Sequence, residues 1–159
     1  ARGEVICRVM RRFLILVSVG WLVAGLAAQA ATGRVIKVLP HYLDKSGQHT
    51  AHPSLYARDA YQADLRKHPA KQSGLQFDVQ WTAMTSRPLK LRIEMRGALD
   101  QKTTAAVVEQ EVKYRGFFHK WTKVPFTGAD FKKFGQLSAW RATLWDGDQL
   151  LSEQKSFLW

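Results

Sequence analysis

The sequence predicts an all-β domain with one added helix, built as an antiparallel β-sandwich of about seven strands, of immunoglobulin or fibronectin type III type. Three observations support this fold class. Several segments alternate apolar and polar residues with period two, which is typical of strands that bury one face. Turn residues separate these segments, and no alternation of strands with helices is present. The Cys…Trp…Cys spacing of antibody domains is absent, which excludes a true antibody-type domain.

Residues 1–30 have the features of an export signal. Two arginines precede an apolar run from Phe13 to Ala28, and a small-x-small cleavage pattern ends at Ala30. We therefore expect a secretory signal peptide, cleaved after Ala30, with Met10 as the start residue. An uncleaved membrane anchor is the alternative, but the apolar run is shorter than the ~20 residues that a spanning helix needs.

Cleavage would leave residues 31–159 as a single β-sandwich domain, long enough for a packed core. The one cysteine, Cys7, lies in the removed segment, so the domain would have no disulfide and no thiolate chemistry. Four of the 24 Lys and Arg residues and one of the 13 Asp and Glu residues are removed as well, which leaves a formal net charge of 20 − 12 = +8. A basic domain of this kind attracts polyanions.

The domain begins with a strand, a loop and the helix. Residues 34–39 alternate as a strand that we expect Pro40 to end, and residues 41–49 form a loop. The helix follows an N-cap at Ser54 and ends before Pro69. A helix of about three turns is marginal alone, so it must pack on a sheet. Its apolar face consists of residues three or four apart: Ala57, Ala60, Tyr61 and Leu65.

Four further strands follow the helix. Residues 74–83 and 89–96 show the strictest alternation, and both are expected to bury one face. Residues 104–114 form the next strand, with a turn at 97–102 before it. Residues 118–126 alternate less regularly, and Pro125 near their end favours an edge position.

Two pairs of aromatic residues are expected to anchor the core. Trp81 and Trp140 are the candidates for its central pair. Phe131 and Phe134 lie three apart on a single helical turn that ends at Gly135, and they would close one end of the sandwich.

The C-terminal segment from residue 136 predicts a β-hairpin. We expect a three-residue loop, Asp146-Gly147-Asp148, because that register places Leu144 opposite Leu150 inside and Arg141 opposite Glu153 outside. Three aromatic residues share the outward parity of this hairpin: Trp145, Phe157 and Trp159. If exposed, they would form a partner site, but we expect the helix to cover them because it must pack somewhere.

Three segments of the chain, residues 38–49, 54–63 and 139–148, resemble those of small uncharacterised secreted bacterial proteins with an immunoglobulin-like sandwich. The resemblance would extend over nearly all of residues 31–159. It implies export and this fold, and it implies no activity.

The stretch from Phe117 to Lys123 interleaves aromatic and basic residues, which can stack on sugar or base rings while they pair with anionic groups. The alternative, which the usual burial of tryptophan favours, is an edge strand whose lysines prevent edge-to-edge pairing. The candidate ligand-binding residues, two of them on the next helical turn, are His119, Lys120, Trp121, Lys123, Lys132 and Lys133.

Three histidines, His41, His49 and His52, are weak candidates for a zinc or copper site. A solvated loop explains them equally well, because cysteine ligands are lacking. We found no nucleophile motif, no carboxylate pair away from basic neighbours and no phosphate-binding loop, so we expect neither an enzyme nor a cofactor.

Together these features predict an exported, monomeric, non-catalytic domain that binds an envelope or extracellular partner, either an anionic glycan or an acidic protein surface. We expect it to be secreted or periplasmic, to meet the membrane only through the signal segment before cleavage, and to bind no nucleic acid physiologically. Two alternatives stay open: an assembly domain that contacts proteins through strand edges or the terminal hairpin, and a histidine-based metal-binding protein.

Overall fold

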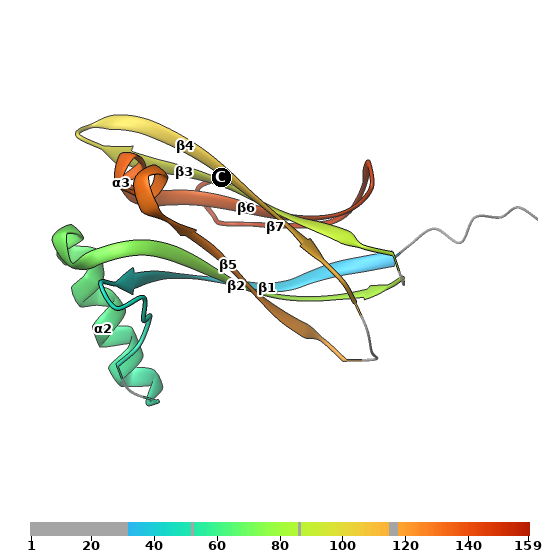
Figure 1. The fold of residues 1–159 in the computed structure, drawn as a ribbon, viewed down its shortest axis with the longest axis horizontal. Helices are drawn as coiled ribbons and strands as arrows, with labels where there is room; N and C mark the ends of the chain where they lie inside the picture. Colours follow the sequence, from blue (N-terminus) through green and yellow to red (C-terminus); the bar gives the residue numbers. More distant parts are fainter. Residues whose placement is uncertain (1–31, 52, 86, 115–117) are drawn as a thin grey trace, which may run out of the picture. The chain divides into compact units, whose positions relative to one another are not determined.

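Two antiparallel sheets of three and four strands confirm the predicted β-sandwich with an added helix (Figure 1). This computed structural model describes residues 32–51, 53–85, 87–114 and 118–159. The strand order is β1-β2-β5 in one sheet and β4-β3-β6-β7 in the other. The immunoglobulin or fibronectin type III subtype stays a prediction.

The strands are β1 (Thr32–Asp44), β2 (Gln72–Met84), β3 (Leu89–Leu99), β4 (Lys102–Val112), β5 (Lys120–Thr127), β6 (Gln136–Asp146) and β7 (Gln149–Lys155). The helical elements are α2 (Leu55–Lys67), the 3₁₀ turn η1 (Pro69–Lys71) and α3 (Gly128–Phe134). The predicted signal segment, residues 1–30, lies outside the described residues. No helix of the described part of the chain has the length and hydropathy to cross a bilayer.

Strands β2 and β3 supply most of the largest fully buried side chains, and their alternation is as predicted. Burying each large apolar side chain contributes about 1.5–3 kcal/mol. Trp81 lies at the centre, and its aromatic neighbour is Tyr114, at 5.7 Å between ring centroids. Trp140 is only partly buried at the margin of the core, so the expected pairing with Trp81 is wrong. The inward residues of β2 and β3, all at most 2% exposed, are Leu75, Phe77, Val79, Trp81, Ala83, Leu89, Leu91, Ile93 and Met95.

Strand β1 continues through Pro40, where the sequence led us to expect its end. Pro40 lies opposite Phe77 of β2, and β1 has no strand on its other side within the sheet. An edge strand tolerates proline because the missing N–H can face away from the ladder. His41 therefore lies in a strand and is buried, rather than in a loop.

Helix α2 lies where the sequence predicted it, but a buried amide fastens it to β1. The side chain of Gln62 accepts the Tyr42 N–H at 2.8 Å and donates to the Tyr42 and His49 carbonyls at 2.9 and 2.7 Å. Leu65 is buried as expected, whereas Ala60 is exposed. Gln62 thus supplies hydrogen-bond partners for the buried backbone groups of Tyr42. Apolar periodicity alone does not indicate that a polar residue lies on the packed face of the helix.

The terminal hairpin has a different register from the one expected. Asp146 pairs with Gln149, so the loop contains two residues, and its first residue, Gly147, has φ +57. A two-residue loop alone would exchange the two faces of β7. An irregularity beside Leu144 adds one residue on β7 and restores the parity, so that Leu144 lies opposite Ser152.

The end of the sandwich beside α3 is closed as predicted. Phe131 and Phe134 are buried, and both meet Phe126 of β5 nearly edge-on, with ring centroids 6.2 and 5.4 Å away. Strand β5 pairs only with β2 in its sheet, which confirms the edge position expected from Pro125. These contacts fix the position of β5, on which the candidate binding residues lie.

Candidate ligand-binding face

The predicted basic and aromatic residues of β5 point to two different sides. Val124 and Phe126 are buried, so Lys120 shares their inward parity, and its Nζ donates to the Lys113 carbonyl at 2.8 Å. Trp121 and Lys123 have the opposite parity and project from the outer face of the β1-β2-β5 sheet. Lys120 therefore lies at the end of the sandwich rather than beside Trp121.

Trp121 is 48% exposed, which contradicts the expectation of a buried tryptophan. Its neighbour across the ladder is Gln80, and the next residue in the same row is Lys37 of β1. Because adjacent strands lie about 4.8 Å apart, this row extends for about 10 Å from Trp121 to Lys37. An aromatic ring, an amide and an ammonium group thus lie side by side in one row across the sheet.

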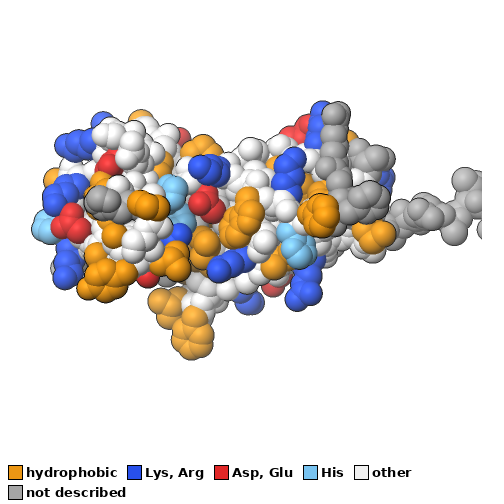
Figure 2. All heavy atoms as spheres, turned by 90° about the horizontal axis from the view of Figure 1, so that it is seen from below, with side chains coloured by type: hydrophobic (Ala, Val, Ile, Leu, Met, Phe, Trp, Pro, Cys, Tyr) orange, Lys and Arg blue, Asp and Glu red, His pale blue; other side chains and the backbone are white. Residues whose placement is uncertain are grey.

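The next rows extend this surface along the strands. Lys123 lies opposite Asp78, and Asp78 lies opposite Leu39. We call this outer surface the Trp121 face; its members are Lys37, Leu39, His41, Gln76, Asp78, Gln80, Trp121, Lys123 and Pro125. Seen from the side of this sheet, hydrophobic, basic, acidic and histidine side chains are interspersed (Figure 2).

The Trp121 face carries basic groups that are free to meet a ligand. Lys37 and Lys123 are exposed, and neither has an ion-pair partner among the described residues. The one carboxylate of the face, Asp78, is already engaged: its Oδ1 accepts from Gln76 Nε2 at 2.7 Å, and its Oδ2 lies 3.6 Å from His41 Nε2. The face therefore presents a local excess of positive charge beside an exposed indole.

The other predicted binding residues lie elsewhere. His119 directly precedes β5 and is exposed, next to the end of the Trp121 face. Lys132 and Lys133 are exposed on α3, after the opposite end of β5. Thr127 lies six residue steps along the strand from Trp121, a distance of about 20 Å. The two α3 lysines do not extend the surface around Trp121.

The histidines proposed as metal ligands are only partly brought together. The rings of His41 and His49 lie 5.0 Å apart between centroids. Burial lowers the pKa of His41, although the carboxylate of Asp78 acts in the opposite direction. His52 lies outside the described residues. Within the described ranges, no group of three or more histidine, cysteine or acidic side chains is arranged to hold a metal ion.

A cavity of about 480 Å³ beside α2 contains acidic groups whose bonds are already made. The Tyr61 hydroxyl donates to Asp44 at 2.5 Å, which lowers the pKa of Asp44 and raises that of Tyr61. Asp64 pairs with Lys71 at 2.8 Å, and this bond lowers the pKa of Asp64. The first bond joins the end of β1 to α2, and the second joins α2 to η1.

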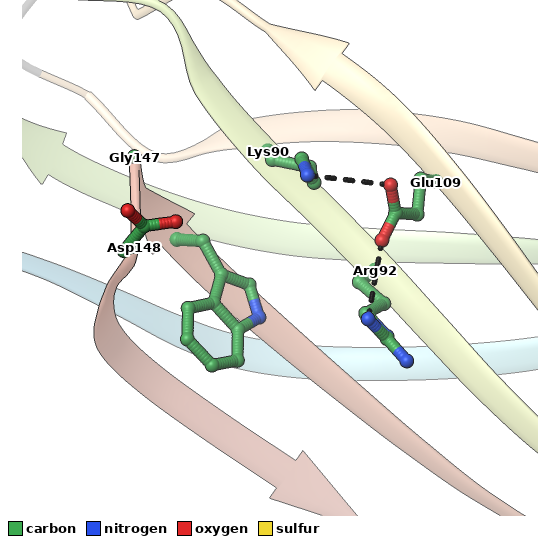
Figure 3. Close-up of a pocket in the computed structure, with 6 residues that line it drawn as sticks. Lys90, Arg92, Glu109, Gly147 and Asp148 are labelled. Atoms are coloured by element: carbon green, nitrogen blue, oxygen red, sulfur yellow. Dashed lines mark hydrogen bonds and ion pairs between the residues drawn. The ribbon is translucent and has the colours of Figure 1, made fainter.

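The outer face of the other sheet carries a connected set of charges that the sequence did not indicate. Glu109 of β4 lies 3.3 Å from both Lys90 and Arg92 of β3, at a cavity of about 170 Å³ (Figure 3). Arg92 lies 2.9 Å from Glu94, and Arg141 of β6 binds Glu94 through two nitrogens at 2.9 and 2.5 Å.

Trp159 completes this surface. The guanidinium carbons of Arg96 and Arg141 lie 4.3 and 5.1 Å from the centroid of its ring. We call the outer surface formed by Lys90, Arg92, Glu94, Arg96, Glu109, Arg141 and Trp159 the paired-charge face. Arg141 thus pairs with Glu94 of the neighbouring strand, and the expected pair with Glu153 is wrong.

The expectation that α2 covers the hairpin aromatics is also wrong. The helix packs on β1, and Phe157 is fully exposed. Trp145 is half-buried, and its indole N–H donates to the Thr143 hydroxyl at 2.8 Å.

No protein-family model, no curated protein and no solved structure matches this chain. The resemblance to small secreted proteins therefore stays a prediction, and function has to be argued from the geometry of the two faces.

Proposed function

We propose that this protein is a non-catalytic binding domain that holds an anionic glycan on its Trp121 face. The observation that carries the proposal is Trp121 itself, 48% exposed near the start of the edge strand β5, with Gln80 and Lys37 in the same row and Lys123 two residues along β5. Tryptophan is enriched at binding interfaces relative to the rest of protein surfaces.

The chemistry of these groups fits a charged sugar polymer. An indole ring offers an apolar surface on which a sugar ring can stack, and stacking on an aromatic side chain contributes about 1–3 kcal/mol in the related case of nucleic-acid bases. The Gln80 amide can both donate to and accept from sugar hydroxyls. The ammonium groups of Lys37 and Lys123 can pair with sulfate, carboxylate or phosphate groups.

A binding role is supported by the state of the acidic groups as well. The carboxylates described above are engaged by arginine, lysine, histidine or tyrosine partners, as Glu94 is by Arg92 and Arg141. A glycosidase would need two carboxyl groups that face each other across a cleft. We therefore retain the proposal of a protein without catalytic activity.

The proposed place of action is the periplasm or the cell exterior. It rests on the export signal in residues 1–30, with cleavage after Ala30, and it makes envelope or extracellular polymers the accessible partners. An acidic protein surface is the alternative ligand, because it carries negative charge as an anionic glycan does. An assembly role through strand edges is the second candidate function, and the regular edge of β4 favours it.

Titration of the purified protein with glycans tests this proposal. Tryptophan fluorescence would be followed with a sulfated glycan and its neutral counterpart, each at low and moderate salt. We expect saturable binding of the sulfated glycan that weakens with salt and becomes about tenfold or more weaker in Trp121→Ala, the loss of about 1.4 kcal/mol.

Two matched variants serve as controls. Phe157→Ala removes an exposed aromatic ring elsewhere, and Lys67→Gln removes one exposed charge from α2; both should bind as the unaltered protein does. Equal binding by Trp121→Ala and the unaltered protein to each sulfated glycan would exclude the Trp121 face as a glycan site. Binding to an acidic protein without binding to any glycan would select the other ligand class.

A further inference from the structure

The four strand edges of this sandwich are not equally protected against pairing with another chain. Strand β1 carries Pro40 and two irregularities in its register with β2. Strand β5 carries Pro125 together with Lys120 and Lys123. Strand β7 is short, has an irregularity in its pairing with β6 and lies against β1, where the Val35 N–H donates to the Ser152 hydroxyl at 3.1 Å. Prolines, bulges and lysines are the usual protection of exposed edges.

Strand β4 has none of these protections over most of its length. Its eleven residues, Lys102–Val112, pair with β3 without any irregularity, and they include no proline. The run 103–108, Thr-Thr-Ala-Ala-Val-Val, carries no charge and consists largely of residues that favour strands. No described strand pairs with its outer edge. Helix α3 contacts β4 through the hydroxyl of Thr104, and its Asp130 and Lys133 border, with residues 104–107, a cavity of about 320 Å³ beside β4.

We propose that β4 pairs antiparallel with β4 of a second copy of this chain, in the register that places Val107 opposite Val107. Val107 is the midpoint of β4, so this register pairs the strand over its full length. It is also 52% exposed on the outer face, and pairing two such side chains across a two-fold axis would bury part of both.

The charges along β4 favour a second copy in this register. Glu109 lies opposite Ala105 and Glu111 lies opposite Thr103, so no like charges face each other. The acidic end of one strand lies beside Lys102 of the other. The contact is the same on both chains and closes on itself, as expected for a two-fold dimer. The two four-stranded sheets would become one continuous sheet of eight strands.

Sedimentation analysis of the full chain tests the association. We expect a dimer for the unaltered protein and for Val107→Thr, which keeps an uncharged β-branched side chain. Val107→Lys should shift the protein to the monomer mass, because two ammonium groups would then face each other on the axis. Its circular dichroism and thermal unfolding, compared with those of Val107→Thr, would show that the fold is kept, as expected for an exposed position.

Disulfide cross-linking tests the register, in a Cys7→Ser background that removes the one native thiol. Facing residues of an antiparallel pair lie about 4.5–5.5 Å apart between Cα atoms, within reach of a disulfide. Val107→Cys should therefore form a covalent dimer on oxidation. In Ala105→Cys the two thiols would lie about 13 Å apart along the strands, so this variant should stay uncross-linked.

Several outcomes would overturn the proposal. One is an unaltered protein that stays monomeric at about 100 µM, because specific dimers have dissociation constants below this concentration. Another is a dimer that persists in Val107→Lys and is not cross-linked in Val107→Cys. Such a dimer would form through another surface. Cross-linking of Ala105→Cys instead of Val107→Cys would exclude the symmetric register.

Discussion

The two outer faces of the sandwich carry similar residue types but differ in how their charges are paired. On the paired-charge face, Glu94 and Glu109 connect Lys90, Arg92 and Arg141 into a continuous set of ion pairs. On the Trp121 face, Lys37 and Lys123 have no such partner in the described chain, and the indole beside them is exposed.

This difference separates a structural surface from a surface available to a ligand. A guanidinium group that donates through two nitrogens to one carboxylate and lies over the Trp159 ring, as that of Arg141 does, has little capacity left for a partner. A lysine without a partner can exchange its bound water and counterions for an anionic ligand. Net charge alone would not distinguish the two faces, since both contain more basic than acidic residues.

The largest effect is expected from the core beneath both faces. Trp81 is fully buried, and its indole N–H donates to the Thr122 hydroxyl at 2.8 Å, next to Trp121. Trp81→Ala should lower the free energy of unfolding by about 3–5 kcal/mol, measured by urea denaturation. Trp81→Phe, which keeps most of the volume, should cost clearly less. A loss below about 1 kcal/mol for Trp81→Ala would contradict the tight packing of this core.

Breaking the paired-charge face should cost less than opening the core. Glu94→Gln removes the carboxylate between Arg92 and Arg141. Hydrogen bonds to charged groups contribute about 1.5–3 kcal/mol, and partial exposure reduces this contribution. The variant should therefore lower the free energy of unfolding by about 1–2 kcal/mol. Lys123→Gln on the Trp121 face should change stability by less than about 0.5 kcal/mol. Equal losses in the two variants, by urea denaturation, would remove the distinction between the faces.

A smaller, pH-dependent effect is expected at His41. Burial holds the pKa of His41 below the ordinary value of 6.5. The Asp78 carboxylate raises this pKa, whereas the nearby charges of His49, Arg58 and Arg66 lower it further. The unfolded chain therefore takes up a proton before the folded one does. Stability should fall as the pH decreases from about 6.5 through the folded pKa and then level off.

Urea denaturation between pH 7.5 and pH 5, compared with His41→Gln, measures this contribution. The variant should show a flatter dependence on pH over this range. The same slope in both proteins would mean that another group is responsible for the loss of stability.

The smallest effect is expected from the lysines of α3. Lys132→Gln and Lys133→Gln should bind a sulfated glycan as tightly as the unaltered protein, because these residues lie at the far end of β5, whereas Lys123→Gln should bind it several-fold more weakly. Fluorescence titration of the three single variants gives the comparison. A similar loss in all three would indicate one binding surface that extends along the whole strand.

The alternation of residues was sufficient to predict that β2, β3 and β4 are strands and that β2 and β3 bury one face. Spacings of three or four residues indicated the helix and the turn with Phe131 and Phe134, and Pro125 indicated the edge position of β5. These features depend on local geometry, since a period of two or 3.6 residues specifies one buried side without reference to the rest of the chain.

The candidate site was predicted only in part. Trp121 and Lys123 were named because they lie in one short stretch, while Lys37 and Gln80 belong to strands far away in sequence. Only cross-strand pairing brings these four side chains into adjacent rows. The same limit applies to Lys132 and Lys133, which are near in sequence and distant in space.

The sequence by itself determined the elements, the buried sides of its strands and the basic character of the domain. The tertiary structure decided the hairpin register, the passage of β1 through Pro40, the exposure of Trp121 and the choice of Glu94 as the partner of Arg141. The physical reason is that each of these depends on which strand lies alongside. A neighbouring strand decides whether a missing N–H is tolerated, which carboxylate an arginine can reach and whether an aromatic ring on the outer face is covered.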